Sequence, residues 1–129
     1  MKQPIFIFLL AISCMVLNAC KKEAVNNTIL INFINQTGAQ IQQATANNVP
    51  IGTIANNAQT GFIRFESFRI DPPMPDCDFV GILNNDTLKS TAQFYFCGTQ
   101  KAQLQPGKYT IEVKLYTSGN NQYFDLQFR

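Results

Sequence analysis

The sequence predicts an all-β fold, an antiparallel β-sandwich of about seven or eight strands that follows a cleaved N-terminal signal helix. Short runs rich in β-branched and aromatic residues recur along the chain, and clusters of Asn, Asp, Gly and Pro separate them. Near the C-terminus apolar and polar side chains alternate with the period of a strand. After residue 27 no stretch shows sustained helical periodicity. An open barrel is the alternative arrangement of the same strands.

The N-terminal segment has the pattern of a secretory signal peptide. Lys2 precedes an apolar run, residues 5–17, that is broken only by Ser13. A membrane-spanning helix needs about 20 apolar residues, so this run is too short for a permanent span. The segment therefore predicts an exported protein.

The tetrapeptide Leu17-Asn18-Ala19-Cys20 ends this segment. It resembles the lipobox of bacterial lipoproteins, although Asn18 is unusual at its position. The resemblance implies cleavage before Cys20 and acylation of its thiol, and two or more acyl chains anchor durably at about 0.8 kcal/mol per buried methylene. It also implies a lipid-anchored protein of the bacterial cell envelope, at the outer membrane, facing either the periplasm or the outside. An ordinary cleaved signal with an incidental cysteine is the alternative.

These features divide the chain into three parts. Residues 1–19 are the predicted signal peptide, residues 20–27 the lipidated cysteine and its tether, and residues 28–129 the β-sandwich domain. The tether carries Lys21-Lys22-Glu23 and no apolar pattern, which indicates a solvated linker. These charged residues also resemble the surface-export signals of some bacterial lipoproteins, and such a signal is the alternative. The remainder has the usual size of one domain.

The composition excludes several classes of function. Once Lys2 is removed with the signal, nine basic residues face eight acidic ones, so the charge predicts no nucleic-acid partner. Histidine is absent, which removes Ser-His, Cys-His and His-metal arrangements. The sequence thus predicts a non-catalytic protein without a cofactor. Because a glycosidase needs only two carboxylates, Glu66, Glu112 and the aspartates leave that alternative open.

The first half of the domain contains four predicted strands. Residues 28–34 carry apolar side chains on both faces, as a central strand does. Residues 39–46 and 51–54 are weaker strands. Residues 62–70 predict one long strand, with one face towards the core and one partly wet face.

The middle of the chain begins with residues 71–78, where three prolines predict a loop or a sheet edge. Residues 79–83 and 88–96 predict a hairpin around Asn84-Asn85-Asp86. A second hairpin is predicted at the C-terminus, where residues 109–116 and 123–129 flank Ser118-Gly119-Asn120-Asn121.

Before this last hairpin stands Leu104-Gln105-Pro106-Gly107-Lys108-Tyr109. It resembles the turn and tyrosine that open a strand in Greek-key sandwiches, including immunoglobulin-like and transthyretin-like domains. The resemblance implies that the Tyr109 hydroxyl donates a hydrogen bond to the backbone of the preceding loop. An ordinary Pro-Gly turn is the alternative.

Cys77 and Cys97 are the thiols left for a disulfide in an oxidising compartment. Closing a loop of about twenty residues stabilises a fold by around 3 kcal/mol. A simple hairpin displaces the two cysteines by three or four residues, some 10 Å or more. The predicted bridge therefore requires the proline-rich segment to fold back, or the two strands to lie in facing sheets.

Two further sets of side chains are weaker candidates. Asp71, Asp76 and Asp78 form a weak candidate metal site, because calcium binds oxygen ligands on irregular loops. Solvated carboxylates in a turn are the alternative, since aspartate is common in turns. Aromatic side chains on the polar sides of strands are candidates for facing a ligand, and they are Tyr95, Tyr116 and Tyr123. A cross-strand aromatic pair that only stabilises the sheet is the alternative.

Two functions follow from these observations. The first is a lipid-anchored envelope module that binds a protein partner, through an exposed sheet edge for example. The second is a carbohydrate-binding or adhesin-like surface lipoprotein that uses the exposed tyrosines.

Overall fold

A computed structural model describes residues 27–91 and 101–129 of the chain. The predictions made for residues 1–26, including the signal peptide and the acylated Cys20, lie outside the described residues. So do Tyr95 and Cys97. In the described part of the chain, no helix has the length and apolar character needed to cross a membrane.

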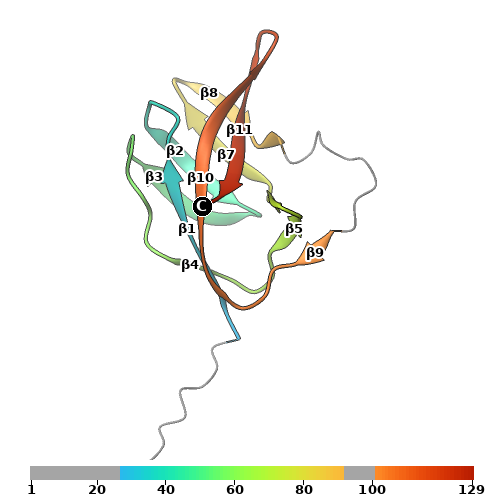
Figure 1. Ribbon diagram of the computed structural model, residues 1–129. Coiled ribbons are helices and arrows are strands. Elements are labelled where there is room, and N and C mark those ends of the chain that lie inside the picture. The colour runs from blue at the N-terminus through green and yellow to red at the C-terminus, as the bar shows by residue number, and fades with distance from the viewer. Residues whose placement is uncertain (1–26, 92–100) are drawn as a thin grey trace, which may run out of the picture.

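The described residues form an all-β fold in which two four-stranded sheets face each other, as expected of a β-sandwich (Figure 1). The first sheet has the order β11-β10-β1-β4 and the second has the order β3-β2-β7-β8. The first sheet consists of β1 (Ile29–Asn35), β4 (Ile63–Phe65), β10 (Gly107–Ser118) and β11 (Asn121–Phe128). The second consists of β2 (Ile41–Ala46), β3 (Val49–Ile54), β7 (Phe79–Leu83) and β8 (Asp86–Lys89).

A third, smaller sheet makes the prediction of seven or eight strands too low, because eleven strands are described. It has the order β6-β5-β9 and consists of β5 (Arg69–Asp71), β6 (Met74–Asp76) and β9 (Ala102–Gln103). The proline-rich segment is thus half of a hairpin. It tolerates Pro75 because β6 is the last strand of its sheet, where a backbone donor is not needed.

The single long strand predicted over residues 62–70 is wrong. The chain leaves the first sheet after Phe65 and enters β5 only at Arg69. Phe65 and Phe68 are both buried, and their rings meet edge to face at 5.3 Å. Residues three apart point to opposite faces of a regular strand, so the chain bends to bury both rings.

One strand pair departs from the predicted antiparallel arrangement. β1 pairs with β10 in parallel from Ile29↔Gly107 to Asn35↔Val113, whereas the other pairs of neighbouring strands in the described sheets are antiparallel. A parallel pair needs a long connection, and here the whole second sheet lies within it. Because β10 is longer than β1, the β10–β11 hairpin projects beyond β1 (Figure 1).

The predicted hairpins are confirmed. The second sheet turns through Asn84-Asn85, both with positive φ, and this two-residue turn pairs Leu83 with Asp86. β8 therefore starts two residues earlier than predicted, and residues 92–96 of the predicted strand lie outside the described ones. The C-terminal hairpin pairs Ser118 with Asn121 and buries Phe124 and Leu126.

The predicted hydrogen bond of Tyr109 is also present, since its hydroxyl donates to the carbonyl oxygen of Gln105 at 3.0 Å. This bond ties the loop before β10 to the start of the strand. It does not by itself establish the strand order of a Greek key.

Candidate functional site

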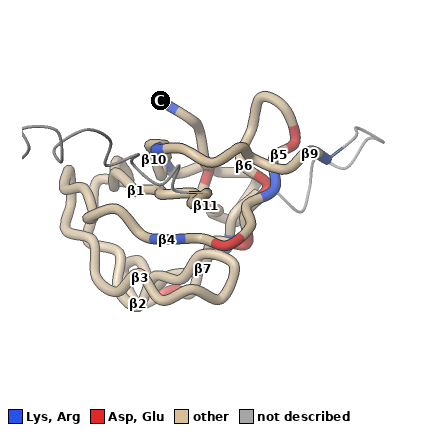
Figure 2. The backbone as a smooth tube through the Cα atoms, turned by 90° about the horizontal axis from the view of Figure 1, so that it is seen from below, with Lys and Arg blue, Asp and Glu red and all other residues tan. Residues whose placement is uncertain are grey.

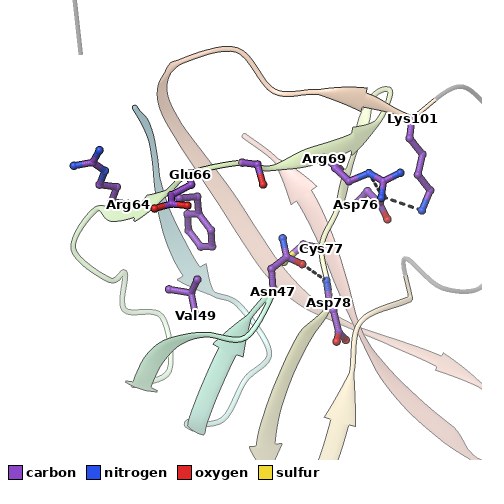
Figure 3. A pocket seen from close by; sticks show the side chains of 11 residues that line it. Asn47, Val49, Arg64, Glu66, Arg69, Asp76, Cys77, Asp78 and Lys101 are labelled. Atoms are coloured by element: carbon purple, nitrogen blue, oxygen red, sulfur yellow. Dashed lines mark hydrogen bonds and ion pairs between the residues drawn. The ribbon is translucent and has the colours of Figure 1, made fainter. Parts of the chain in front are cut away.

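A cleft of about 750 Å³ opens where the edges of the two large sheets approach each other, and we call it the edge cleft (Figure 3). Four separate segments line it, and they are Asn47 and Val49 at the β2–β3 turn, residues 64–67 with Arg69, residues 76–78, and Lys101. β4 and β3 are the last strands of their sheets. The cleft therefore lies between two strand edges.

The floor of the edge cleft is apolar. Phe65 is 3% exposed and Cys77 is 1% exposed, and both belong to the hydrophobic core. Val49 is half-buried beside them. An apolar side chain that entered the cleft would therefore meet carbon and sulfur atoms rather than unpaired polar groups.

The walls of the edge cleft are charged, and Figure 2 shows basic and acidic segments following one another from β4 towards β5 and β6. On one wall the Asp76 carboxylate lies 2.9 Å from the Lys101 ammonium and 4.0 Å from Arg69 Nε. On the other wall Arg64 and Glu66 are exposed, and neither side chain has an ion pair or hydrogen bond among the described residues. The cleft thus offers unpaired charged side chains of both signs, since the exposed carboxylate of Asp78 also has no ion pair or hydrogen bond among the described residues.

A pair of hydrogen bonds holds the lower side of the edge cleft. The Asn47 side-chain oxygen accepts from the backbone N–H of Asp78 at 2.9 Å, and the Asn47 N–H donates to the Asp78 carbonyl at 2.9 Å. Asn47 and Asn48 both have positive φ, which suits a tight two-residue turn between β2 and β3. The turn is therefore fixed against the β6–β7 connection.

A second cleft, of about 560 Å³, lies between the tips of two hairpins, and we call it the tip cleft. β8 (Asp86–Lys89) forms one wall, and Thr117 and residues 119–123 of the C-terminal hairpin form the other. Tyr123 lines this cleft and pairs in register with Tyr116. Tyr116 is 43% exposed.

The structure brings together some of the predicted site residues and separates others. Asp76, Cys77 and Asp78 line the edge cleft, whereas Asp71 does not. Among the residues that the structure describes, no three His, Cys, Asp or Glu side chains are placed to hold a metal ion. Arg64, Arg69 and Lys101 were not predicted, because exposed basic residues far apart in sequence give no local signal of meeting.

Cys77 is a free buried thiol in the described part of the chain, and its predicted partner Cys97 lies outside that part. The disulfide stays a prediction. When Cys77 is not in a disulfide, the pKa of its thiol is raised from 9.0 to about 12, and burial is the largest cause. The negative charge of Asp78 and, more weakly, of Asp76 adds to this, and a hydrogen bond with the Asn47 backbone opposes it.

We expect the reduced, folded protein to resist alkylation at Cys77 up to about pH 12, since only the thiolate reacts. Mass spectrometry of the peptide that carries Cys77, after iodoacetamide pulses, measures the alkylation rate, and urea-unfolded protein is the control. An alkylation rate in the folded protein that rises with a midpoint near pH 9.0 would contradict the expectation.

The same shift affects stability. Because the pKa of Cys77 is higher in the folded state than in the unfolded state, the thiol form contributes stability that is lost as pH rises from 9.0 to about 12.

A parallel unfolded sample prepared without reductant tests the predicted disulfide. If Cys77 is bonded to Cys97, iodoacetamide should not label it in that sample.

Comparisons of the chain with protein-family models, with curated proteins and with solved structures find no match. The class of protein is therefore defined by fold and clefts alone. The described residues form a small all-β domain of sandwich type whose open clefts include one that is charged and one that is rich in amides and hydroxyls.

Proposed function

We propose that the protein is a lipid-anchored module of the bacterial cell envelope that binds a protein partner without transforming it. One observation carries the proposal, namely the edge cleft with its apolar floor, its free Arg64 and Glu66, and the strand edge of β4 beside it. The lipobox-like Leu17-Asn18-Ala19-Cys20 supports the anchor and the location.

An extended peptide segment of the partner is the occupant that fits this cleft. In the described part of the chain β4 has a strand neighbour only on the β1 side, so its other edge can accept backbone hydrogen bonds. An apolar peptide side chain would pack on Phe65 and Val49. Acidic and basic side chains of the peptide would pair with Arg64 and Glu66.

Site-specific photo-crosslinking in cells that make the full chain tests this proposal. A photoreactive amino acid at Ser67, on the cleft wall, is expected to give one discrete adduct in the membrane fraction. The same amino acid at Gln127, exposed on β11 outside both clefts, is expected to give none. Mass spectrometry of the adduct should map the link to an extended segment with an apolar residue between charged ones.

Two variants make the result decisive. Val49→Arg fills the edge cleft, and it should abolish the Ser67 adduct while the protein remains folded by thermal melting. Cys20→Ala should move the protein out of the membrane fraction. A Ser67 adduct that survives Val49→Arg would refute the binding site, and a Cys20→Ala protein that stays membrane-bound and uncleaved by mass would refute the anchor.

A further inference from the structure

The walls of the tip cleft are two strand edges. β8 is the last strand of the second sheet and β11 is the last strand of the first. The two strands run in the same direction, and a parallel bridge joins Ser90, the residue after β8, to Phe124 of β11. The residues that precede this bridge in each strand line the cleft, so the two edges diverge from it towards the hairpin turns.

The lining of the tip cleft is polar but nearly without net charge. Asp86 and Lys89 supply one charge of each sign. The other polar side chains are the amides of Asn120, Asn121 and Gln122 and the hydroxyls of Thr87, Thr117 and Tyr123. Amides and hydroxyls both donate and accept hydrogen bonds, which matches a ligand whose own groups do both. The edge cleft differs, because six charged residues line it.

Aromatic surface lies beside these polar groups. Tyr123 lines the tip cleft, and Tyr116 lies directly opposite it on the neighbouring strand. A tyrosine combines an apolar ring with a polar hydroxyl, so it can contact C–H groups and hydroxyl groups of one ligand at once.

The tip cleft also lies far from the point where the chain enters the domain. β1 begins at Ile29 beside Gly107, the first residue of β10, whereas the cleft adjoins the last residues of the twelve-residue β10 (Figure 1). At about 3.3 Å per residue, this separates the two by more than 30 Å along the strand. A ligand in the tip cleft would therefore lie at the end of the domain opposite its predicted tether.

We propose that the tip cleft binds a neutral oligosaccharide. Sugar hydroxyls would pair with the amides of Asn121 and Gln122 and with the hydroxyl of Thr117, and a sugar ring would pack against Tyr123. This site is separate from the edge cleft, so the test of sugar binding does not depend on whether the edge cleft binds a protein partner.

The test uses the purified full-length processed protein in detergent on an array of neutral and acidic glycans, followed by calorimetric titration of the best neutral oligosaccharide. The double variant Asn121→Ala/Gln122→Ala is expected to weaken binding about tenfold, from the loss of two or more hydrogen bonds. Tyr123→Ala should weaken it to a similar degree. Gln42→Ala, which removes an exposed amide on β2 of the second sheet, should leave the affinity unchanged. Because the ligand is neutral, raising the salt concentration should not change the affinity.

Several outcomes would overturn the proposal. One is the absence of any neutral glycan signal on the array, and another is an affinity that the Asn121→Ala/Gln122→Ala variant leaves intact while it remains folded by thermal melting. Binding of acidic glycans alone, with strong salt dependence, would also count against it. A random-peptide display selection run in parallel would also overturn the proposal if peptide binding required Asn121 and Gln122 while no sugar bound.

Discussion

Replacing Phe79 by alanine is expected to lower the free energy of unfolding by about 3–5 kcal/mol. Phe79 is fully buried and projects from the second sheet against two rings of the first. Its ring lies 5.2 Å from Phe124, edge to face, and 5.5 Å from Phe33. The substitution would leave a cavity between the sheets and remove both aromatic contacts.

Urea unfolding, followed by circular dichroism, measures this loss. Phe79→Leu should cost clearly less than Phe79→Ala, because it keeps much of the buried volume. Phe62→Ala is the matched control, since Phe62 is 50% exposed and its ring centroid lies 5.4 Å from the Lys108 Nζ. This substitution should lower the free energy of unfolding by less than about 1 kcal/mol. Equal losses for Phe62→Ala and Phe79→Ala would show that the contact between the sheets is not where the structure places it.

Replacing Asn35 by leucine is expected to destabilise the protein by about 3 kcal/mol or more, from the loss of several buried hydrogen bonds. Asn35 is fully buried at the end of β1. Its side-chain amide donates to the carbonyl oxygens of Ala39, Ile54 and Ala55 at 2.7, 2.9 and 3.2 Å. Its side-chain oxygen accepts from the Thr37 N–H at 3.0 Å and from the Thr37 hydroxyl at 2.7 Å. One side chain thus joins β1, the loop that follows it and the end of β3.

Asn32→Leu provides the comparison at a second buried asparagine of the same strand. Asn32 is 6% exposed, and its side-chain oxygen is buried without a hydrogen-bond partner among residues 27–91 and 101–129. Removing an unpaired buried acceptor should change stability by less than about 1 kcal/mol in either direction. If chemical unfolding showed similar losses for Asn32→Leu and Asn35→Leu, the bonding assigned to Asn35 would be wrong.

Both residues show where reasoning from sequence stops. The run at residues 28–34 correctly predicts a strand buried on both faces. It gives no sign that Asn35, the next residue along the chain, also lies in the strand and that its side chain binds a segment about twenty residues further on. The sequence position of an asparagine predicts a turn because turns are local, whereas the carbonyl groups that its amide meets are brought by other strands.

The C-terminal hairpin is where sequence reasoning worked best. Alternation of apolar and polar residues through β10 and β11 predicts the buried face, and Ser118-Gly119-Asn120-Asn121 predicts the turn. The bond from Tyr109 to Gln105 spans four residues, so it too is local. By contrast, the bend that buries Phe68 interrupts an otherwise regular strand pattern, since burying two rings outweighs continuing a strand at a sheet edge.

The sequence by itself determined the all-β class, the hairpins with their turns, and the side chains that face the core of the last two strands, because each depends on neighbours within a few residues. Only the tertiary structure decided that β1 lies beside β10, that Asn47, Arg64, Asp78 and Lys101 share one cleft, and that Ser90, just after β8, forms a bridge with Phe124 of β11. These juxtapositions join segments far apart in the chain. They arise from the packing of whole sheets, which no local pattern of residues encodes.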